Sequence, residues 1–464
     1  MKKLLFCAVL FTLIAAPSFA QLADYISINA WGRAAFLPLW YETPEMQYGV
    51  QKPNSAGIYK NGVGVSWDPN NAPRVDFRIN GGTNYIGFMV HVNAESTTGV
   101  GYGDNGAQIW VKPFGNNWLK AVISNKMIDD TLRGKVGTDA GGLESFVLGS
   151  SMMKVQNGMD PGLDSIFYRF AGGAGSNMST ANSSNTSTPI SPQSLLPNVI
   201  FLSTSPINGL FVGLMLQGMF PDTDLKKTWR LMQLGAGYEI PKVGHLRAQY
   251  IGGFTGKEKQ GEDFNLTDAA HFEVAFAYTA MQNLLIDVGV KLWMPLENLM
   301  GQSVYNGVDV AMGAKYSTGG FNFSAIGEVF SIGSYTGNQM HTPDSDKGAN
   351  GLHFTFGLVP AWDFTFGTLG LCVISQTQMA NTDSTGAQDR ASAWARFGTG
   401  VWYRRVLDRG SIVIGVTYAF PQIGYGNPPS TMGPDGRPVV TPPETGFTGR
   451  GILTIPIIVD YWFF

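Results

Sequence analysis

The stretch His271–Trp293, HFEVAFAYTAMQNLLIDVGVKLW, decides the fold class. Apolar side chains recur at every second position on both sides of the short link Ala280–Gln282. They are Phe272, Val274, Phe276 and Tyr278, then Ile286, Val288, Val290 and Leu292. A period of two indicates β-strands, whereas a helix would place apolar residues three and four apart. Each half has the length of a tilted membrane strand, about 9–11 residues, so the stretch predicts a membrane-spanning hairpin.

The same alternation continues from Ile26 to the end of the chain. It predicts eighteen strands, at 26–36, 73–80, 85–92, 106–113, 117–124, 197–204, 209–218, 230–240, 244–254, 269–279, 283–293, 307–316, 321–331, 350–358, 362–374, 393–404, 410–420 and 451–463. Two weaker segments, Leu143–Gly149 and Ser165–Phe170, add either a further hairpin or a structured loop, and Gly62–Trp67 is the weakest additional candidate. We therefore expect an all-β, antiparallel, up-and-down transmembrane barrel of about 18 strands, within the range of 16 to 20.

Short and long connections alternate along the chain. Turns such as Ser317–Gly320 and Leu407–Gly410 separate longer polar loops around 37–72, 93–105, 125–196, 255–268, 294–306, 332–349, 375–392 and 421–450. Short periplasmic turns opposite long external loops are typical of outer-membrane barrels. The sequence thus predicts one barrel over residues 21–464, with a long loop at 125–196 that either folds into the lumen or lies on the surface.

The N-terminus carries the features of a secretory signal peptide. Lys2 and Lys3 precede an apolar run, and small residues lead to a cleavage site after Ala20, so residues 1–20 are expected to be removed. The remaining chain has 29 basic and 34 acidic residues, a net charge of −5. That balance gives no reason to expect a nucleic-acid partner.

Composition and cysteine content agree with a barrel. Charged residues make up 14% of the chain against a typical 25%, and glycine occurs 59 times in 464 residues. Cys7 leaves with the leader, so Cys372 is left alone and an intramolecular disulfide is excluded. Grouping Trp362–Ile374 as one strand puts Cys372 on the apolar face, where it is expected to face lipid.

The chain ends in Asp460-Tyr461-Trp462-Phe463-Phe464. This end resembles the closing strand of Gram-negative outer-membrane barrels, in which a terminal aromatic residue is an assembly signal. The resemblance implies that Phe463 and Phe464 are read by the barrel-assembly machinery and that outer-membrane lipid surrounds the protein. The alternation predicts that Asp460 faces inward, with Phe464 one residue beyond the membrane register.

A second resemblance rests on Asn29–Phe36, Ile109–Phe114 and Asp129–Lys135. These segments are similar to those of porin-like outer-membrane proteins from spirochaetes. The resemblance covers mainly residues 21–135 and the closing strand, and it implies a multi-pass barrel in the cell outer membrane that is not an enzyme. It fixes neither the solute nor whether the barrel is a monomer or a homo-oligomer.

Charged residues within strands are expected to face the lumen, because a midplane Arg or Lys facing lipid costs about 2–4 kcal/mol. Basic residues come from strands that closure brings together: Arg33, Arg74, Arg78, Arg396 and Arg404. Acidic residues come from strands farther round: Glu273, Asp287 and Asp309. The two sets either form opposed walls of a constriction or pair with neighbouring charges in a polar interior.

The long loop adds Asp129, Asp130 and Glu144, which would face the basic wall if the loop folds inward. Trp31, Trp293 and Trp402 share the inward parity and are candidates to line the pore.

The sequence offers no catalytic motif. The five histidines are scattered, no metal-ligand spacing occurs, and no Gly-x-Ser-x-Gly elbow is present, so we expect no catalytic residue, metal or cofactor. The function that fits is passive diffusion of small polar solutes through an outer-membrane channel. The alternatives are a channel for hydrophobic compounds, and a surface adhesin or structural barrel whose long loops bind other surfaces.

Overall fold

The structure is a computed structural model, and it describes residues 26–64, 74–95, 106–124, 198–218, 232–251, 271–297, 303–332, 335–336, 348–349, 351–382, 388–389, 393–425, 431–432, 438–439 and 445–463. No helix in these ranges is long and apolar enough to cross a membrane.

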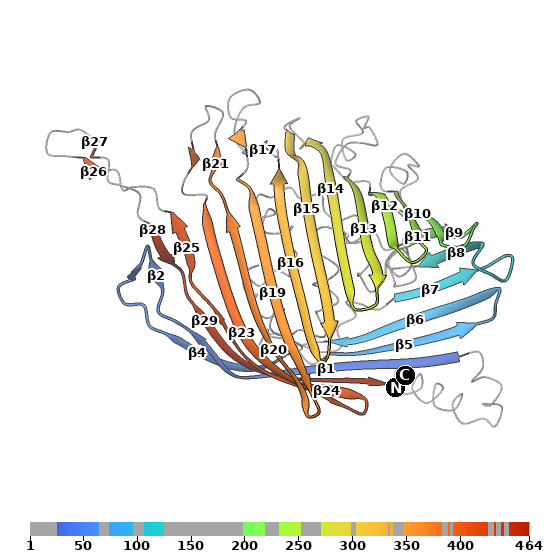
Figure 1. Cartoon of the computed structure of the whole chain (residues 1–464), viewed down its shortest axis with the longest axis horizontal. Helices are drawn as coiled ribbons and strands as arrows, with labels where there is room; N and C mark the ends of the chain where they lie inside the picture. The colour runs from blue at the N-terminus through green and yellow to red at the C-terminus, as the bar shows by residue number, and fades with distance from the viewer. Residues whose placement is uncertain are drawn as a thin grey trace, which may run out of the picture.

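Eighteen antiparallel strands close into one barrel, as the sequence predicts (Figure 1). In ring order they are β1 (Ile26–Glu42), β5 (Arg74–Gly82), β6 (Ile86–Glu95), β7 (Gly106–Val111), β8 (Leu119–Ser124), β9 (Asn198–Thr204), β10 (Leu210–Gly218), β11 (Gln233–Ile240), β12 (Gly244–Ile251), β13 (His271–Met281), β14 (Leu284–Glu297), β15 (Ser303–Thr318), β16 (Phe321–Ile332), β19 (His353–Phe364), β20 (Gly367–Gln378), β23 (Trp394–Leu407), β24 (Gly410–Ala419) and β29 (Ile452–Phe463). Every neighbour in this ring is the next strand along the chain, so the topology is up-and-down.

Closure is made by the first and last strands. Residues of β1 from Ala30 to Glu42 pair with β29, and residues from Ile26 to Arg33 pair with β5 on the other side. No strand edge in the ring is left unpaired, which is the condition for a sheet to lie in lipid.

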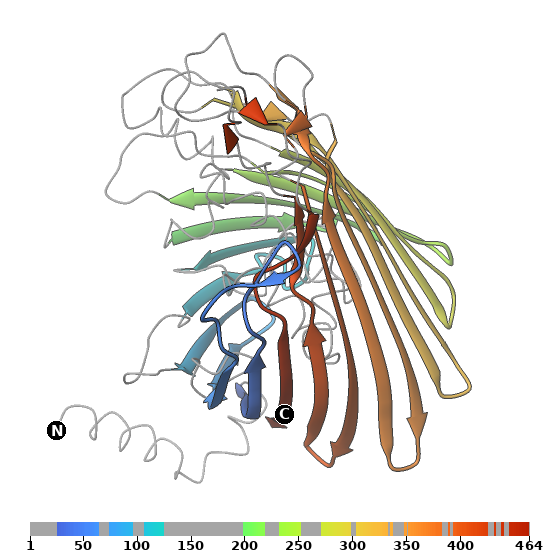
Figure 2. The ribbon, with the colours of Figure 1, turned by 90° about the vertical axis from the view of Figure 1, so that its left-hand side faces the viewer.

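The tight turns lie at one end of the barrel, where β1 begins and β29 ends (Figure 2). The turn between β15 and β16 shows why these links can be so short. Gly319 and Gly320 have φ angles of 55° and 83°, in the left-handed region that a two-residue hairpin turn requires and that glycine adopts without strain.

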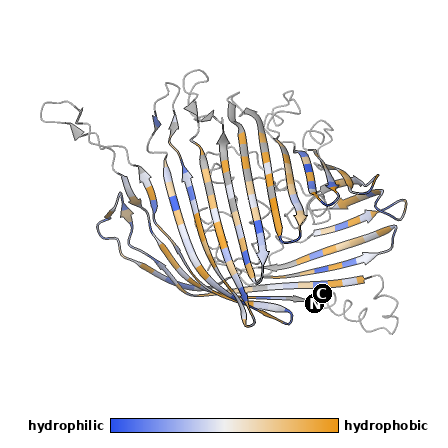
Figure 3. Ribbon diagram, in the orientation of Figure 1, coloured by the Kyte–Doolittle hydropathy of each residue, from blue (hydrophilic) through white to orange (hydrophobic). Residues whose placement is uncertain are grey.

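Polar and apolar residues alternate along many of the barrel strands (Figure 3), and burial places them on different faces of the sheet. The outward positions of β14 carry Val288, Val290 and Leu292, which are exposed, while Gly289 between them is buried. Inward positions on other strands hold polar groups, and the hydroxyls of Thr417 and Thr454 meet at 2.8 Å. An apolar exterior around a polar interior is the pattern of a membrane barrel.

Aromatic rings gather at both ends of the outer face. At the short-turn end Phe364 stacks on Phe366 with ring centroids 5.1 Å apart. At the loop end Tyr41 lies 4.5 Å from Tyr59, and Tyr418 lies 4.6 Å from Phe420. Two such belts mark the levels at which a barrel meets the lipid headgroups.

The first predicted loop, 37–72, is partly wrong. β1 continues past residue 36 to Glu42, through a register shift between Phe36 and Leu39, and β4 (Ile58–Gly64) pairs with this extension. Gly62 and Gly64, from the weakest of the predicted segments, therefore lie in a strand. The predicted loop at 421–450 likewise contains β25 (Gln422–Tyr425) and β28 (Thr445–Thr448), which pair with each other.

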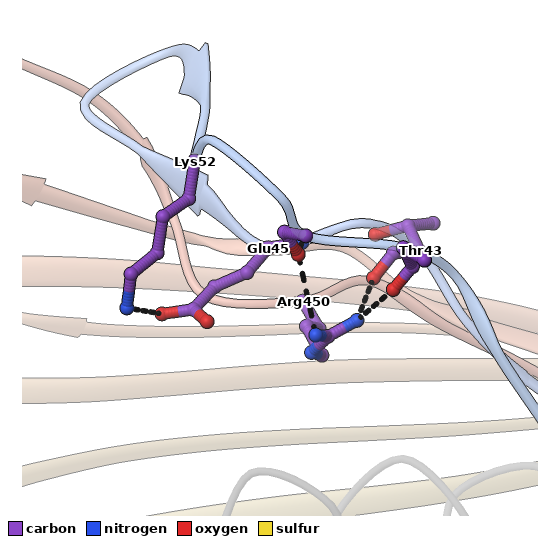
Figure 4. Close-up of polar contacts among 6 residues, drawn as sticks. Thr43, Glu45, Lys52 and Arg450 are labelled. Carbon is purple, nitrogen blue, oxygen red and sulfur yellow. Dashed lines mark hydrogen bonds and ion pairs between the residues drawn. The ribbon is translucent and has the colours of Figure 1, made fainter.

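Arg450 fastens these two extensions together (Figure 4). Its Nη1 donates to the carbonyl oxygens of Thr43 and Ala56, both at 2.8 Å, and its Nη2 donates to Ser55 Oγ at 3.2 Å. Beside it, the ammonium of Lys52 lies 3.1 Å from the carboxylate of Glu45. One guanidinium thus satisfies carbonyls at both ends of the segment 43–56.

Cys372 was predicted to face lipid, and this prediction is wrong. The chain turns at Phe364–Gly367, so β19 and β20 are separate strands and the alternation restarts at Gly367. Cys372 is on the inner side, 0% exposed. Asp460, in contrast, is buried and faces inward as predicted, with Ser411 Oγ 3.5 Å from its Oδ2.

The short elements away from the barrel wall are β2 (Met46–Gln47), β3 (Val50–Gln51), β17 (Tyr335–Thr336), β18 (Gly348–Ala349), β21 (Asn381–Thr382), β22 (Gln388–Asp389), β26 (Thr431–Met432) and β27 (Pro438–Val439). The expected leader 1–20, the segments Leu143–Gly149 and Ser165–Phe170, and Phe464 lie outside the described residues.

Candidate functional site: the inner wall

The predicted basic residues lie on strands that are close together in the ring. Arg396 and Arg404 are on β23, Arg33 is on β1, and Arg74 and Arg78 are on β5. These strands occupy a run of five, β23-β24-β29-β1-β5. β13, with Glu273, is nine steps from β1 in either direction, half of the ring. Asp287 and Asp309 follow on β14 and β15, and β15 is four steps from β23. The acidic strands therefore lie opposite β1, but β15 lies within a quarter of the ring of β23.

The basic side is not uniformly basic. Arg33 lies opposite Arg74 on one side and opposite Asp460 on the other. An inward carboxylate is therefore placed at the same level as two arginines, next to the closing seam. Arg78 lies four residues closer to the short-turn end than Arg74, opposite Asn29 and His91.

The acidic side is mixed as well. Glu273 lies opposite Lys291, and Lys291 lies opposite Asp309 on the next strand. Arg247 of β12, which is only 1% exposed, lies opposite Ala275, one inward step along β13 from Glu273. Opposite charges placed directly across a strand pair stabilise each other, so these backbone positions favour ion pairing within the wall as much as a field across the lumen.

On β23 the inward positions are occupied by Trp394, Arg396, Gly398, Gly400, Trp402 and Arg404. At the loop end the guanidinium of Arg396 lies over the ring of Trp394, with its Cζ 4.8 Å from the centroid. Arg396 Nε donates to Gln422 Oε1 at 3.0 Å, and Trp394 Nε1 donates to Gln378 Oε1. These contacts fix the orientation of both side chains.

At the other end of this row, Trp402 lies flat over Gly370 of β20. A Cβ at Gly370 would lie 2.2 Å from two ring carbons of Trp402, so only glycine leaves room for the indole there. Trp402 is buried, 4% exposed, which agrees with its predicted inward parity. Its Nε1 has no hydrogen-bond partner among the described residues.

Sequence reasoning missed a second tryptophan–cation group at the loop end. Trp40 Nε1 donates to Glu42 Oε1 at 3.1 Å, Lys60 Nζ lies 2.7 Å from the same oxygen, and Lys60 lies 5.6 Å from the centroid of Trp40. The register shift between Phe36 and Leu39 reverses the alternation and turns these residues inward. A sequence signal exists in Pro38, since proline inside a strand often marks such a bulge.

A third group lies on the β7–β8 hairpin at the short-turn end. The ammonium groups of Lys112 and Lys120 lie 5.0 and 5.5 Å from the centroid of Trp110. Trp110 itself packs over Gly87, where an added Cβ would lie 2.2 Å from its ring. The inner wall thus holds its cations against aromatic rings in several places.

Part of the predicted site cannot be placed. Asp129, Asp130 and Glu144 lie outside the described residues, and so does Phe464. Phe463 ends β29, opposite Ala30 of β1. Among the described residues, no group of three or more His, Cys, Asp or Glu side chains is placed to hold a metal ion.

Solved structures of similar architecture are outer-membrane channels and related proteins. The anion-selective porin from Comamonas acidovorans is 12% identical, with a TM-score of 0.46 over 94% of this chain and 100% of that one. OpdQ from Pseudomonas aeruginosa is 11% identical, with a TM-score of 0.49 over 95% and 98%. OmpT from Vibrio cholerae, in its trimer form, is 11% identical, with a TM-score of 0.40 over 95% and 100%.

No family model and no curated protein matches the chain. The spirochaete type of the resemblance is therefore not supported, and identities this low transfer no solute or activity between proteins. The function is therefore inferred from the residues of this protein's own inner wall.

Proposed function

We propose that the protein is an outer-membrane channel for passive diffusion of small polar solutes. The observation that carries the proposal is the closed ring of 18 strands with an apolar outer and a polar inner face. Rings of this size leave room for an aqueous lumen, with about 35 Å between opposite backbones at the usual strand spacing and tilt. Passive diffusion requires only a polar inner wall along which hydrated solutes can move.

Charge and size selectivity come from that wall. Arg33, Arg74 and Arg78, together with Arg396 and Arg404, bias one side toward anions. The loop 125–196, with Asp129, Asp130 and Glu144, folds toward these arginines and narrows the passage. The support for this part is charge complementarity, together with a loop far longer than the usual 12–15 residues.

Deletion of 134–171 tests the inward loop. Conductance should rise while insertion is retained, because the passage widens without loss of any described barrel strand. Unchanged conductance, together with ready labelling of a cysteine at Glu144 by a bulky impermeant reagent on whole cells, would place the loop outside.

Liposome swelling tests the function itself. Vesicles containing the refolded protein should swell in sugars and amino acids at rates that fall with solute size. Permeation limited to apolar compounds would favour the hydrophobic-compound channel instead. Insertion with no permeation of either class would favour the adhesin or structural barrel. Recognition of Phe463 and Phe464 by the barrel-assembly machinery and assembly into a homo-oligomer are further parts of the same proposal.

A further inference from the structure

The register shift in β1 places a lysine and a glutamate side by side at the loop-end mouth of the lumen. Trp40 and Glu42 lie beyond the shift, and Lys60 of β4 lies opposite Trp40. Trp40 also lies opposite Thr454 of β29, whose side chain faces inward and is 0% exposed. Alternation puts Glu42 and Lys60 on the same inner face as Trp40, and the three residues are here called the mouth site.

Direct contacts hold the two charges of the mouth site in place. Lys60 Nζ lies 2.7 Å from Glu42 Oε1, Trp40 Nε1 donates to the same oxygen at 3.1 Å, and the ammonium group lies 5.6 Å from the centroid of the Trp40 ring. Arg450 donates to the carbonyl oxygens of the residue directly after Glu42 and of the residue four before Lys60. The spacing of the two charges is therefore set by side-chain and backbone contacts together.

Both charged groups keep capacity for a further partner. An ammonium group has three N–H donors, and Lys60 gives one of them to Glu42. The hydrogen bonds that Glu42 accepts from the described residues both end on Oε1, so none of them ends on Oε2. The side chain of Lys60 is 47% exposed and that of Glu42 is 14% exposed, so the pair is open to water and to a solute in the mouth.

A solute with a single charge fits this pair poorly. An anion drawn to Lys60 is repelled by Glu42 at nearly the same distance, and a cation drawn to Glu42 is repelled by Lys60. A solute that carries both signs of charge, close together, is attracted by both residues. The arrangement therefore favours small zwitterions over simple ions.

We propose that the mouth site binds small zwitterions, with neutral α-amino acids as the class that fits. The ammonium group of the solute donates to Glu42 Oε2, and its carboxylate accepts from Lys60. In an α-amino acid these two groups are about 3 Å apart, the length of a charge-assisted hydrogen bond, which matches the 2.7 Å between Lys60 and Glu42. The four charges then alternate around a square. The proposal rests on the proposed channel function and names a solute class that binds at its loop-end mouth.

Block of single-channel current by L-leucine, added on the side of the long loops, tests the site in the refolded full-length protein. N-acetylleucine keeps the carboxylate without the ammonium group, and leucinamide keeps the ammonium group without the carboxylate. In about 0.1 M KCl, where charges within about 10 Å still interact, leucine should reduce the current saturably. Both derivatives should bind at least about tenfold more weakly, as expected when one charged contact is missing.

Variants that remove one charge should change which solute blocks. Glu42→Gln leaves the cation of Lys60, so block by leucine should weaken about tenfold and block by N-acetylleucine should strengthen. Lys60→Met leaves the carboxylate of Glu42 and should favour leucinamide instead. An ion pair with a structural role only would not reverse the preference in this way. Lys52→Met is the matched control: Lys52 lies 3.1 Å from Glu45 in the segment 43–56, away from the barrel wall, and its replacement should leave block unaltered.

The outcomes separate this proposal from the channel function. Inserted protein without conductance overturns the channel. Normal conductance with equal block by leucine and its two derivatives, or with a preference that Glu42→Gln and Lys60→Met leave unchanged, overturns the mouth site and leaves the channel standing. Loss of leucine block in Lys52→Met would equally overturn the mouth site, because it would show a general effect of charge at the loop end.

Discussion

Val290→Arg is the sharpest test of which face meets lipid. Val290 lies near the middle of β14, between Val274 of β13 and Val310 of β15. It is 41% exposed and Val274 is 51% exposed, so an arginine at this position would project into the apolar band. The inner face is one residue away, at Lys291, which alternation places on the opposite side.

The expected loss follows from this position. An arginine at the lipid midplane of a barrel costs about 2–4 kcal/mol, which is about 30- to 1,000-fold in the ratio of folded to unfolded protein. Lys291→Arg is the matched control. It places the same side chain one residue farther along at a position already cationic, so it should change stability by less than about 0.5 kcal/mol.

Denaturant unfolding in lipid vesicles, followed by tryptophan fluorescence, measures both values. The midpoint should fall for Val290→Arg with little change in the slope of the transition, because the surface exposed on unfolding is unchanged. Equal stability of the two variants would refute the assignment of β14's faces, and with it the outward face of the neighbouring strands.

The remaining predictions concern outer-membrane assembly, ion selectivity and the segment 43–56 held by Arg450. Replacing Phe463 and Phe464 with alanine should lower the amount of heat-modifiable protein in the outer membrane, because closure by β29 would be impaired; normal levels would count against a terminal assembly signal. Changing both Arg74 and Arg78 to glutamate should move the reversal potential in asymmetric KCl toward cation selectivity, and an unchanged potential would place them away from the narrowest point. Arg450→Met should speed amide hydrogen exchange across 43–56 about tenfold, and protection equal to that of the wild type would show that the hydrogen bonds of Arg450 do not stabilise this segment.

The strand number could be predicted because the outer face obeys one rule throughout. Lipid admits only apolar side chains, so a period of two persists in nearly every segment, as Phe272–Tyr278 and Ile286–Leu292 show. Closure then follows, since a barrel in lipid cannot have an open edge. The inward position of Asp460 was predicted by the same rule and is confirmed.

The errors arose where the alternation restarts or shifts. The prediction that Cys372 faces lipid fails because it treats Trp362–Ile374 as one strand, although the chain reverses at Phe364–Gly367. The prediction that Trp40 lies in a loop fails because the register shift between Phe36 and Leu39 interrupts the period of two for a few residues. A register shift of one residue moves every later side chain in the strand to the other face of the sheet. Such shifts and turns therefore decide which side chains face the lumen.

The candidate site was only partly accessible to sequence reasoning. Which strands carry charge could be predicted, and in the ring β13, with Glu273, lies nine steps from β1, with Arg33. Which charged positions lie opposite each other could not, because that depends on the register between strands: Lys291 lies opposite Asp309, and Arg33 lies opposite Asp460. Glycines that accept a tryptophan, such as Gly370 beneath Trp402, also appear only when neighbouring strands are aligned.

Single-channel recording of the refolded full-length chain in a planar bilayer tests the central claim most directly. A water-filled barrel of 18 strands predicts discrete current steps whose size rises in proportion to KCl concentration, without any added cofactor or energy source. Silent bilayers containing heat-modifiable, fully inserted protein would contradict an open diffusion channel.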